Sequence, residues 1–264
     1  MDPEIVLIGA GNLSTHLGKA LHDSSLHVAQ VYSRTEKSAR PLAEAIEADP
    51  VTSLKQVMDC ADLYLYAVKD DALPEVISGI SARAGVHAHT AGGVPMSVFE
   101  GARDQYGVFY PLQTFSKEKP VNFRAIPIFL EANTPSGLAL LHEVAHRIAD
   151  RAFDLDSRQR ETLHVASVFA CNFAKHLWSI ASDLLAEEQL PFDVLMPLIG
   201  ESVSKLHTLP PAKAQTGPAA RGDQNVIARH LEHLAAHPQW RELYRTMTEL
   251  IREKTVENQA ETAK

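Results

Sequence analysis

Hydrophobic residues in the first 155 positions form short continuous runs that alternate with longer segments of helical spacing. The short runs predict buried strands at residues 5–8, 28–32, 63–68, 86–89, 108–110 and 126–130. In one segment between them, Leu13, Leu17 and Leu21 recur every four residues, as in a helix that lies on a sheet. The alternation of strands and helices predicts an α/β fold with a doubly wound parallel sheet.

The pattern changes near residue 156, where strand-like runs end and long helical patterns begin. Asp156 and Gln159 have the spacing of a capping box at the start of a helix over residues 157–189. At 1.5 Å per residue this helix would be roughly 45 Å long. Its middle, residues 165–185, is apolar on nearly every face, which predicts that a second subunit covers it. We therefore expect two domains, residues 1–155 and an all-helical domain of residues 156–264.

A glycine turn between the first predicted strand and the first predicted helix suits a dinucleotide. Gly9 would permit the turn, Gly11 would let the backbone approach a pyrophosphate, and the helix from Asn12 would direct N–H groups at it. The third position of the G-x-G-x-x-G/A pattern is a serine, and Gly18 on the same helical face could supply the missing close packing. Such turns also occur as purely structural turns. The turn predicts a cofactor site that includes Gly9, Gly11, Asn12, Leu13 and Ser14.

The end of the second predicted strand indicates which dinucleotide would bind. An NAD site normally has an acidic residue there, which accepts hydrogen bonds from the ribose hydroxyls. This chain instead has Ser33, Arg34 and Thr35, followed by Lys37. Hydroxyl and cationic groups favour a 2'-phosphate through charge-assisted hydrogen bonds, so we expect NADP(H) as the cofactor. The alternative is that Arg34 and Lys37 are solvated residues at the start of a helix.

Composition narrows the class of protein. The chain has 264 residues, 45% of them hydrophobic and 22% charged, which is enough for one large core or two smaller ones. A net charge of −8 without a dense Lys/Arg stripe argues against a nucleic-acid partner and an anionic membrane. No signal peptide or bilayer-spanning run is visible, and the two cysteines are Cys60 and Cys171. We expect a cytoplasmic protein with buried thiols and no disulfide framework.

Several motifs resemble known families. Residues 9–12, 33–35 and 67–70 are similar to segments of pyrroline-5-carboxylate reductase and of the F420-dependent NADP oxidoreductases. More specific motifs are Tyr-Pro-Leu-Gln-Thr-Phe-Ser-Lys at 110–117, Leu-His-Val-Ala-Ser at 163–167 with Asn172, and Thr-Gly-Pro-Ala-Ala-Arg-Gly-Asp at 216–223. Together they resemble a bacterial family in which a Rossmann-like domain precedes a carboxy-terminal domain of unknown function. Members of that family are sometimes described as NADP oxidoreductases.

This resemblance covers nearly the whole chain. It implies a Rossmann-type sheet followed by an all-helical dimerisation domain similar to that of 6-phosphogluconate dehydrogenase, and it implies no particular substrate. In the related β-hydroxyacid dehydrogenases and ketopantoate reductases, the first long helix of the second domain carries a catalytic Lys four residues before an Asn. Here Asn172 matches the Asn and Val168 occupies the position of the Lys. Lys175, three residues after Asn172, is not a clear substitute, and His164 lies two turns before the Asn. We therefore do not expect a Lys-assisted alcohol oxidation.

Candidate catalytic residues follow the predicted strands. Ligands of open α/β sheets bind beyond the carboxyl ends of the strands, which here include residues 89–93 and the loop 111–116. His89 could act as a general acid near neutral pH, and Gln113, Thr114 or Asn172 could polarise a carbonyl or imine acceptor. His89 could equally be a hydrogen-bonded histidine at a strand end. The strand ends are also expected to complete the cofactor site with Val68, Lys69, Thr90, Ala91 and Gly92.

A second polar cluster lies in the loop before the last helices. The guanidinium of Arg221 could bind a substrate carboxylate or the cofactor phosphates, which makes Arg221 a further candidate. Asp223 could cap the following helix, because Asp is a preferred N-cap residue.

The segment His142-Glu143-Val144-Ala145-His146 spells the H-E-x-x-H pattern of zinc metallopeptidases. The apolar stripe of this predicted helix leaves both histidines at its edge and turns Glu143 to the polar side, where Arg147 can pair with it. A third ligand at a suitable spacing is missing, so we expect no metal here.

The sequence therefore predicts an NADP(H)-binding, dimeric oxidoreductase that transfers a hydride to or from a small carbonyl or imine substrate at an interdomain cleft. The alternative without turnover is an NADP(H)-dependent sensor or assembly factor.

Overall fold

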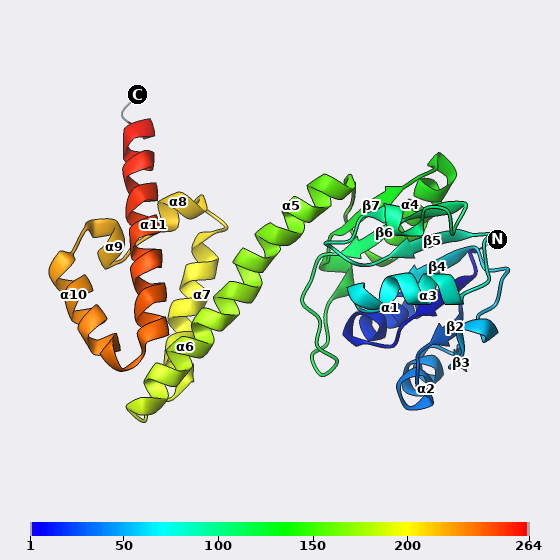
Figure 1. Ribbon diagram of the computed structural model, residues 1–264, viewed down its shortest axis with the longest axis horizontal. Helices are drawn as coiled ribbons and strands as arrows, with labels where there is room; N and C mark the ends of the chain where they lie inside the picture. The colour runs from blue at the N-terminus through cyan, green and yellow to red at the C-terminus, as the bar shows by residue number, and fades with distance from the viewer. Residues whose placement is uncertain (1, 263–264) are drawn as a thin grey trace. The chain divides into compact units, whose positions relative to one another are not determined.

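An eight-stranded sheet forms the centre of the amino-terminal part of the chain (Figure 1). The computed structural model describes residues 2–262, with side chains through residue 258. The strands are β1 (Ile5–Ile8), β2 (Val28–Tyr32), β3 (Asp49–Val51), β4 (Leu63–Tyr66), β5 (Val86–His89), β6 (Gln105–Pro111), β7 (Ile128–Ala132) and β8 (Ala152–Asp154).

The strand order is β3-β2-β1-β4-β5-β6-β7-β8. All neighbouring strands run parallel except β6 and β7, which are antiparallel. This arrangement confirms the predicted α/β fold with a Rossmann-type sheet. The antiparallel pair and the three-residue edge strands β3 and β8 were not predicted from the sequence.

Helices cover both faces of this sheet: α1 (Asn12–Asp23), α2 (Glu36–Ala45), α3 (Leu73–Gly79) and α4 (Pro135–Ile148). Because side chains alternate along a strand, Ile5 and Leu7 of β1 belong to a core shared with α1, α2 and α4, whereas Val6 and Ile8 belong to a core shared with α3. The four residues of β1 are completely buried, which explains why this strand reads as a continuous apolar run.

The carboxy-terminal part is helical. Its helices are α5 (Ser157–Ser167), α6 (Ala174–Glu187), α7 (Met196–Lys205), α8 (Pro211–Ala214), α9 (Pro218–Arg221), α10 (Gln224–His233) and α11 (Pro238–Thr262). A π-helical segment, Val168–Phe173, joins α5 to α6, so residues 157–187 are helical throughout. The predicted capping box is confirmed: the side chains of Asp156 and Gln159 bond each other's backbone N–H groups. The sequence did not predict the π-helical segment.

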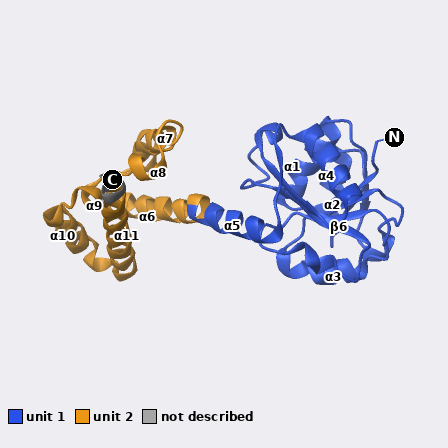
Figure 2. Ribbon diagram, turned by 90° about the horizontal axis from the view of Figure 1, so that it is seen from above, with its two compact units in different colours: residues 1–169 blue, residues 170–264 orange. Residues whose placement is uncertain are grey.

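The chain divides into two compact units, residues 1–169 and 170–264 (Figure 2). This division falls within the helical run, whereas the predicted domain boundary at residues 155 and 156 falls just before α5 begins. The predicted boundary stays a prediction.

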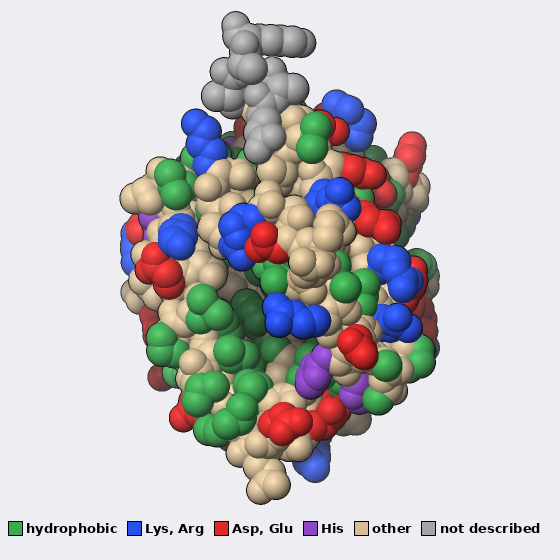
Figure 3. Space-filling model, turned by 90° about the vertical axis from the view of Figure 1, so that its left-hand side faces the viewer, with side chains coloured by type: hydrophobic (Ala, Val, Ile, Leu, Met, Phe, Trp, Pro, Cys, Tyr) green, Lys and Arg blue, Asp and Glu red, His purple; other side chains and the backbone are tan. Residues whose placement is uncertain are grey.

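Many large hydrophobic side chains of the helical part are exposed. Val165, Leu177, Trp178, Leu198 and Leu250 are between 38% and 64% exposed. Figure 3 shows hydrophobic side chains gathered on one part of the face that it presents. Monomeric soluble proteins rarely leave large apolar patches uncovered.

The prediction of buried thiols is wrong, because Cys60 and Cys171 are both free and exposed. Cys60 lies in the loop before β4 and Cys171 in the π-helical segment, where neither is covered by the surrounding chain. Within residues 2–262, no helix combines the length and apolar character needed to cross a membrane.

Candidate functional site

The turn between β1 and α1 combines one crowded glycine with one open glycine. Gly9 has φ +119°, and a Cβ atom built there would lie 2.3 Å from the carbonyl oxygen of Ala67, so no other residue fits without a shift. A Cβ atom on Gly11 would meet no protein atom within 4 Å. Gly11 is also the N-cap of α1 and provides no side chain to cap it. The first N–H groups of α1 therefore face open space, as an anion site requires.

Two small residues of α1, Ser14 and Gly18, allow the helix to pack closely. A Cβ atom on Gly18 would lie within 3.3 Å of Leu7, Leu42 and Ile46, so α1 lies close to the sheet and to α2 there. Ser14 is completely buried, and its hydroxyl faces the carbonyl of Ala67 at 3.4 Å. The structure therefore places Ser14 beneath the turn rather than at its open side.

The loop after β6 is held against the same turn by three hydrogen bonds. Asn12 Nδ2 donates to the carbonyl of Phe115 (3.0 Å), and His16 Nε2 donates to the carbonyl of Ser116 (2.8 Å). Lys117 Nζ donates to the carbonyl of Ala10 (3.0 Å). These bonds fix the loop near the start of α1.

A cavity of about 920 Å³ opens above the carboxyl ends of the strands. Eleven of the predicted cofactor residues line it: Gly9, Gly11, Asn12, Leu13, Ser33, Arg34, Val68, Lys69, Thr90, Ala91 and Gly92. Ser14 and Thr35 are not part of this lining. The cavity thus joins the glycine turn, the end of β2 and the end of β5 in one continuous space.

The end of the cavity at β2 carries one cation and two hydroxyl groups. Ser33, Arg34 and Ser38 line it, and the Thr35 hydroxyl donates to the Ser38 hydroxyl at 3.0 Å. Arg34 is exposed, and within residues 2–258 no carboxylate lies within ion-pair distance of it. Its guanidinium is therefore available to an anionic ligand.

The other end of the cavity carries polar groups near β5 and β6. Tyr110, Gln113 and His164 line it, together with Gly92 and Asp70. Burial is the main cause that raises the pKa of Tyr110, and Asp70 raises it further, whereas Arg160 lowers it. The sequence did not predict Tyr110 and His164 as site residues, although both lie in the motifs at 110–117 and 163–167. The Gln113 side chain accepts a hydrogen bond from the N–H of Thr114. Thr114 itself does not line the cavity.

His89 lies below the cavity rather than in it. Its side chain is completely buried and stacks on Phe99, with the ring centroids 5.8 Å apart. Its Nδ1 accepts a hydrogen bond from the N–H of Ala91 (3.2 Å). Burial and then the charge of Arg160 lower the pKa of His89 to about 4. His89 is therefore neutral at pH 7, and the structure favours the strand-end interpretation over the general acid.

Two further candidates belong to the second unit. Asn172 lies in the π-helical segment and is exposed. Arg221 ends α9 and forms an ion pair with Asp223 at 2.9 Å. The Asp223 side chain does not cap α10; its carboxylate accepts a hydrogen bond from the guanidinium of Arg221. The roles predicted for Asn172 and Arg221 stay predictions.

The H-E-x-x-H segment lies on α4 at the edge of the core. Of the apolar stripe Leu138, Leu141, Ala145 and Ile148 that the sequence predicts, the last three are buried and Leu138 is partly buried. His142 Nε2 pairs with Asp154 at 2.6 Å. The predicted pairing of Glu143 with Arg147 is wrong: Arg147 pairs with Asp2 (2.7 Å). Within residues 2–258, no group of three or more His, Cys, Asp or Glu side chains is placed to hold a metal ion.

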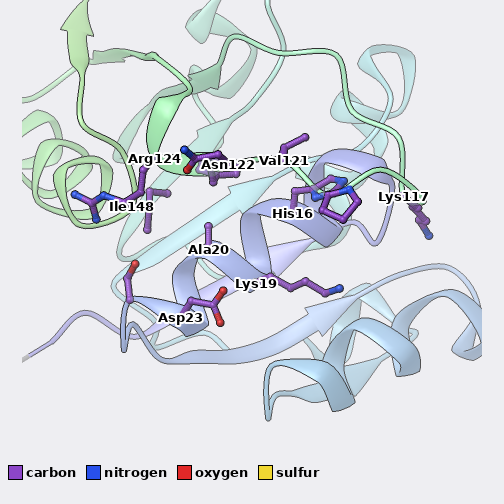
Figure 4. A pocket seen from close by; sticks show the side chains of 12 residues that line it. His16, Lys19, Ala20, Asp23, Lys117, Val121, Asn122, Arg124 and Ile148 are labelled. Atoms are coloured by element: carbon purple, nitrogen blue, oxygen red, sulfur yellow. The ribbon is translucent and has the colours of Figure 1, made fainter.

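A second cavity, of about 460 Å³, lies between α1 and the segment before β7 (Figure 4). Lys19 and Asp23 line its α1 side, and Asn122 and Arg124 line the opposite side. Arg124 is already paired with Asp150 at 3.0 Å, and Lys19 and Asp23 carry opposite charges one turn apart. We assign no ligand to this cavity.

Comparison with known proteins identifies the class. Residues 3–112 match the Rossmann-like domain family, and residues 126–251 match a family described as a domain of unknown function, DUF2520. The chain is 47% identical to the "putative NADP oxidoreductase BF3122" of Bacteroides fragilis, with a TM-score of 0.88. That match covers 96% of this chain and 98% of the Bacteroides chain. The chain belongs to the same family as this Bacteroides protein, which confirms the resemblance seen in the sequence.

More distant structures share the fold. A 1-pyrroline-5-carboxylate reductase from Streptococcus pyogenes is 12% identical with a TM-score of 0.64, and the match covers 96% of this chain and 99% of that one. An imine reductase from Myxococcus stipitatus in complex with NADP⁺ is 15% identical with a TM-score of 0.62, covering 97% and 93%. At these identities the likeness shows the fold alone. No curated protein matches the chain.

Proposed function

We propose that the protein is an NADP(H)-dependent oxidoreductase. The observation that carries the proposal is the cavity of about 920 Å³, which joins an uncapped helix N-terminus to the unpaired Arg34 at one end and to Tyr110 and His164 at the other. The name of the Bacteroides fragilis relative supports the same cofactor and reaction class.

The residues present fit NADP(H). The open space over Gly11 and the N–H groups of α1 would hold the pyrophosphate, and Ser33, Arg34 and Ser38 would hold the 2'-phosphate. The opposite end of the cavity, at Gly92 and Tyr110, is then left for the nicotinamide. When bound, NADPH supplies a hydride; the chain supplies binding and orientation.

The substrate that we propose is a small carbonyl or imine compound. Tyr110, Gln113 and His164 make the nicotinamide end polar, and such groups can bind a C=O or C=N group. A sensor without turnover would be better served by an apolar, sealed end of the cavity, so the lining favours an enzyme. The position of the substrate at an interdomain cleft stays a prediction.

The test of the cofactor is a titration of the protein with NADPH and NADH. Arg34→Ala should raise the Kd for NADPH about 10- to 100-fold and leave the Kd for NADH nearly unchanged, because a charge-assisted hydrogen bond to phosphate is lost. Arg40→Ala is the matched control, since Arg40 is exposed on α2, pairs with Glu36 and does not line the cavity. Equal affinities of the unmodified protein for the two nucleotides would contradict NADP(H) preference.

We also propose that the protein is a homodimer through its helical part. The exposed hydrophobic side chains of α5, α6 and α7 support this, because a second subunit would cover them. An interface built from apolar helix faces is typical of obligate dimers.

A further inference from the structure

His164 lies where α5 meets the cavity. It belongs to the last turn of α5, and its Nδ1 is 3.2 Å from the Tyr110 hydroxyl. The two rings meet edge to face, with centroids 6.2 Å apart and planes at 71°. Within residues 2–258, no residue bonds the other nitrogen, Nε2. His164 is only partly buried, so water reaches it.

The backbone after β5 makes room for this imidazole. A Cβ atom on Gly92 would lie 2.5 Å from His164 Nδ1 and 2.9 Å from Cζ of Tyr110. On the neighbouring Gly93, a Cβ atom would lie 3.6 Å from Cδ2 of His164, which is an ordinary contact. The glycine at position 92 thus lets the Tyr110–His164 pair sit directly on the strand end that faces the cavity.

A buried ion pair fixes α5, and with it His164. Arg160, one turn earlier, is completely buried and pairs with the Glu131 carboxylate on β7. It also donates to the carbonyl of Val94 (2.6 Å), in the segment that follows Gly92 and Gly93. Arg160 thus anchors α5, one turn before His164, to both the sheet and this segment.

The charged side chains near the pair come from two parts of the chain. Arg160 lies on the same helix, and Lys69 and Asp70 follow β4 and line the same cavity. The group that faces Nδ1 is the Tyr110 hydroxyl from β6. Histidine is the side chain that acts most often as a general acid or base in enzymes.

We propose that His164 is the general acid of the reduction, and that Tyr110 positions it; this rests on the proposed NADP(H)-dependent function. In the protonated form, Nδ1–H donates to the Tyr110 oxygen and Nε2–H points to the substrate. As the substrate carbon receives a hydride from the cofactor, the π electrons of the C=N or C=O group take the proton from His164 Nε2 and form an N–H or O–H bond. The neutral imidazole then regains a proton from water.

The decisive experiment is NMR of the full-length protein with ¹⁵N-labelled histidine, the His164 signal being assigned by its loss in His164→Gln. Saturating NADP⁺ should shift the His164 imidazole signals and produce a nuclear Overhauser contact to the nicotinamide ring. Tyr110→Phe keeps the ring but removes the hydroxyl that faces His164 Nδ1, so it should change the ¹⁵N shift of that nitrogen. NADP⁺ binding that leaves His164 unaffected would overturn the inference.

Matched glycine variants test the same placement. Gly92→Ala should displace the imidazole and change its NMR signals, whereas Gly93→Ala should not, because its Cβ atom makes only an ordinary contact. In assays of NADPH oxidation with 1-pyrroline or cyclohexanone, His164→Gln should lower kcat by about 10²- to 10⁴-fold, the usual value of a general acid. A failure of the unmodified protein to bind NADP⁺ would instead contradict the proposed function itself.

Discussion

Gly9 and Gly11 are two residues apart, yet the structure requires them for different reasons. At Gly9 a side chain would collide with the carbonyl of Ala67, so this position governs the fold of the turn. At Gly11 a side chain would meet no protein atom and would fill the space in which we place the pyrophosphate. Substitutions at the two positions should therefore separate stability from binding.

Gly11→Val should abolish NADPH binding while the temperature of unfolding stays close to that of the unmodified protein. The backbone of Gly11 has φ −82° and ψ −166°, which any L-residue can adopt, so valine should not strain the turn. The valine side chain would meet no protein atom at its Cβ and would fill the space where the ligand binds. Gly9→Ala should lower the temperature of unfolding, because the new Cβ atom would lie 2.3 Å from the carbonyl oxygen of Ala67. Fluorescence titration and calorimetry measure the two effects, and normal NADPH affinity of Gly11→Val would contradict the placement.

Buried histidines on β5 make stability depend on pH. Burial, and to a smaller extent the charge of Arg103, lowers the pKa of His87 to about 3. Burial, and to a smaller extent the charge of Arg160, lowers the pKa of His89 to about 4. A histidine in the unfolded chain titrates near 6.5. Since the folded values lie lower, the unfolded state binds more protons than the folded state between about pH 6.5 and about pH 4 for His89, and down to about pH 3 for His87. The stabilisation is complete above that window and is lost within it.

Urea unfolding at a series of pH values from 7 to 4.5 measures this dependence. His89→Gln should make the free energy of unfolding fall less steeply with decreasing pH than in the unmodified protein, because the group that takes up the proton on unfolding is gone. His207→Gln, at an exposed position, should leave the slope unchanged. Identical slopes for the His89 variant and the unmodified protein would show that His89 is protonated in the folded state.

At the scale of elements, the predictable features are those whose signal is local. The apolar run of β1 and the capping box of α5 are both readable from neighbouring residues, and both are present. The edge strands β3 and β8 have three residues each, too few to show a pattern. The reversal of β7 depends on which neighbour it pairs with, and its hydrophobic pattern does not encode direction.

The ion pair between Arg160 on α5 and Glu131 on β7 should contribute strongly to the stability of the protein. Arg160→Met should destabilise the protein by about 3–5 kcal/mol, because the largely buried Glu131 carboxylate would lose its cation and keep only the donors of Ser157. The double variant Glu131→Leu/Arg160→Met should regain much of that loss, since it leaves no unpaired buried charge. Calorimetric unfolding measures both, and equal stability of Arg160→Met and the unmodified protein would rule out the anchor.

At the scale of the whole molecule, the candidate site was predictable only in part. The residues around the glycine turn and the β2 end follow from a motif within one stretch of sequence, and most of them line the cavity. Tyr110 and His164 are 54 positions apart, and the tertiary packing of α5 against the sheet and the Gly92 backbone brings them together. Periodicity contains no information on such a contact, so the sequence suggested the buried His89 instead.

The exposed apolar surface of the helical part predicts the state of the whole molecule in solution. Light scattering at micromolar concentration should report a homodimer. Leu177→Asp should shift the protein toward monomer, because Leu177 on α6 is 39% exposed within one chain and a charge would be buried in the interface. Ser81→Asp, at an exposed position of the first unit, should remain dimeric. A monomer that stays stable and fully folded would mean that these hydrophobic side chains are covered in some other way, and the proposed homodimer would have to be given up.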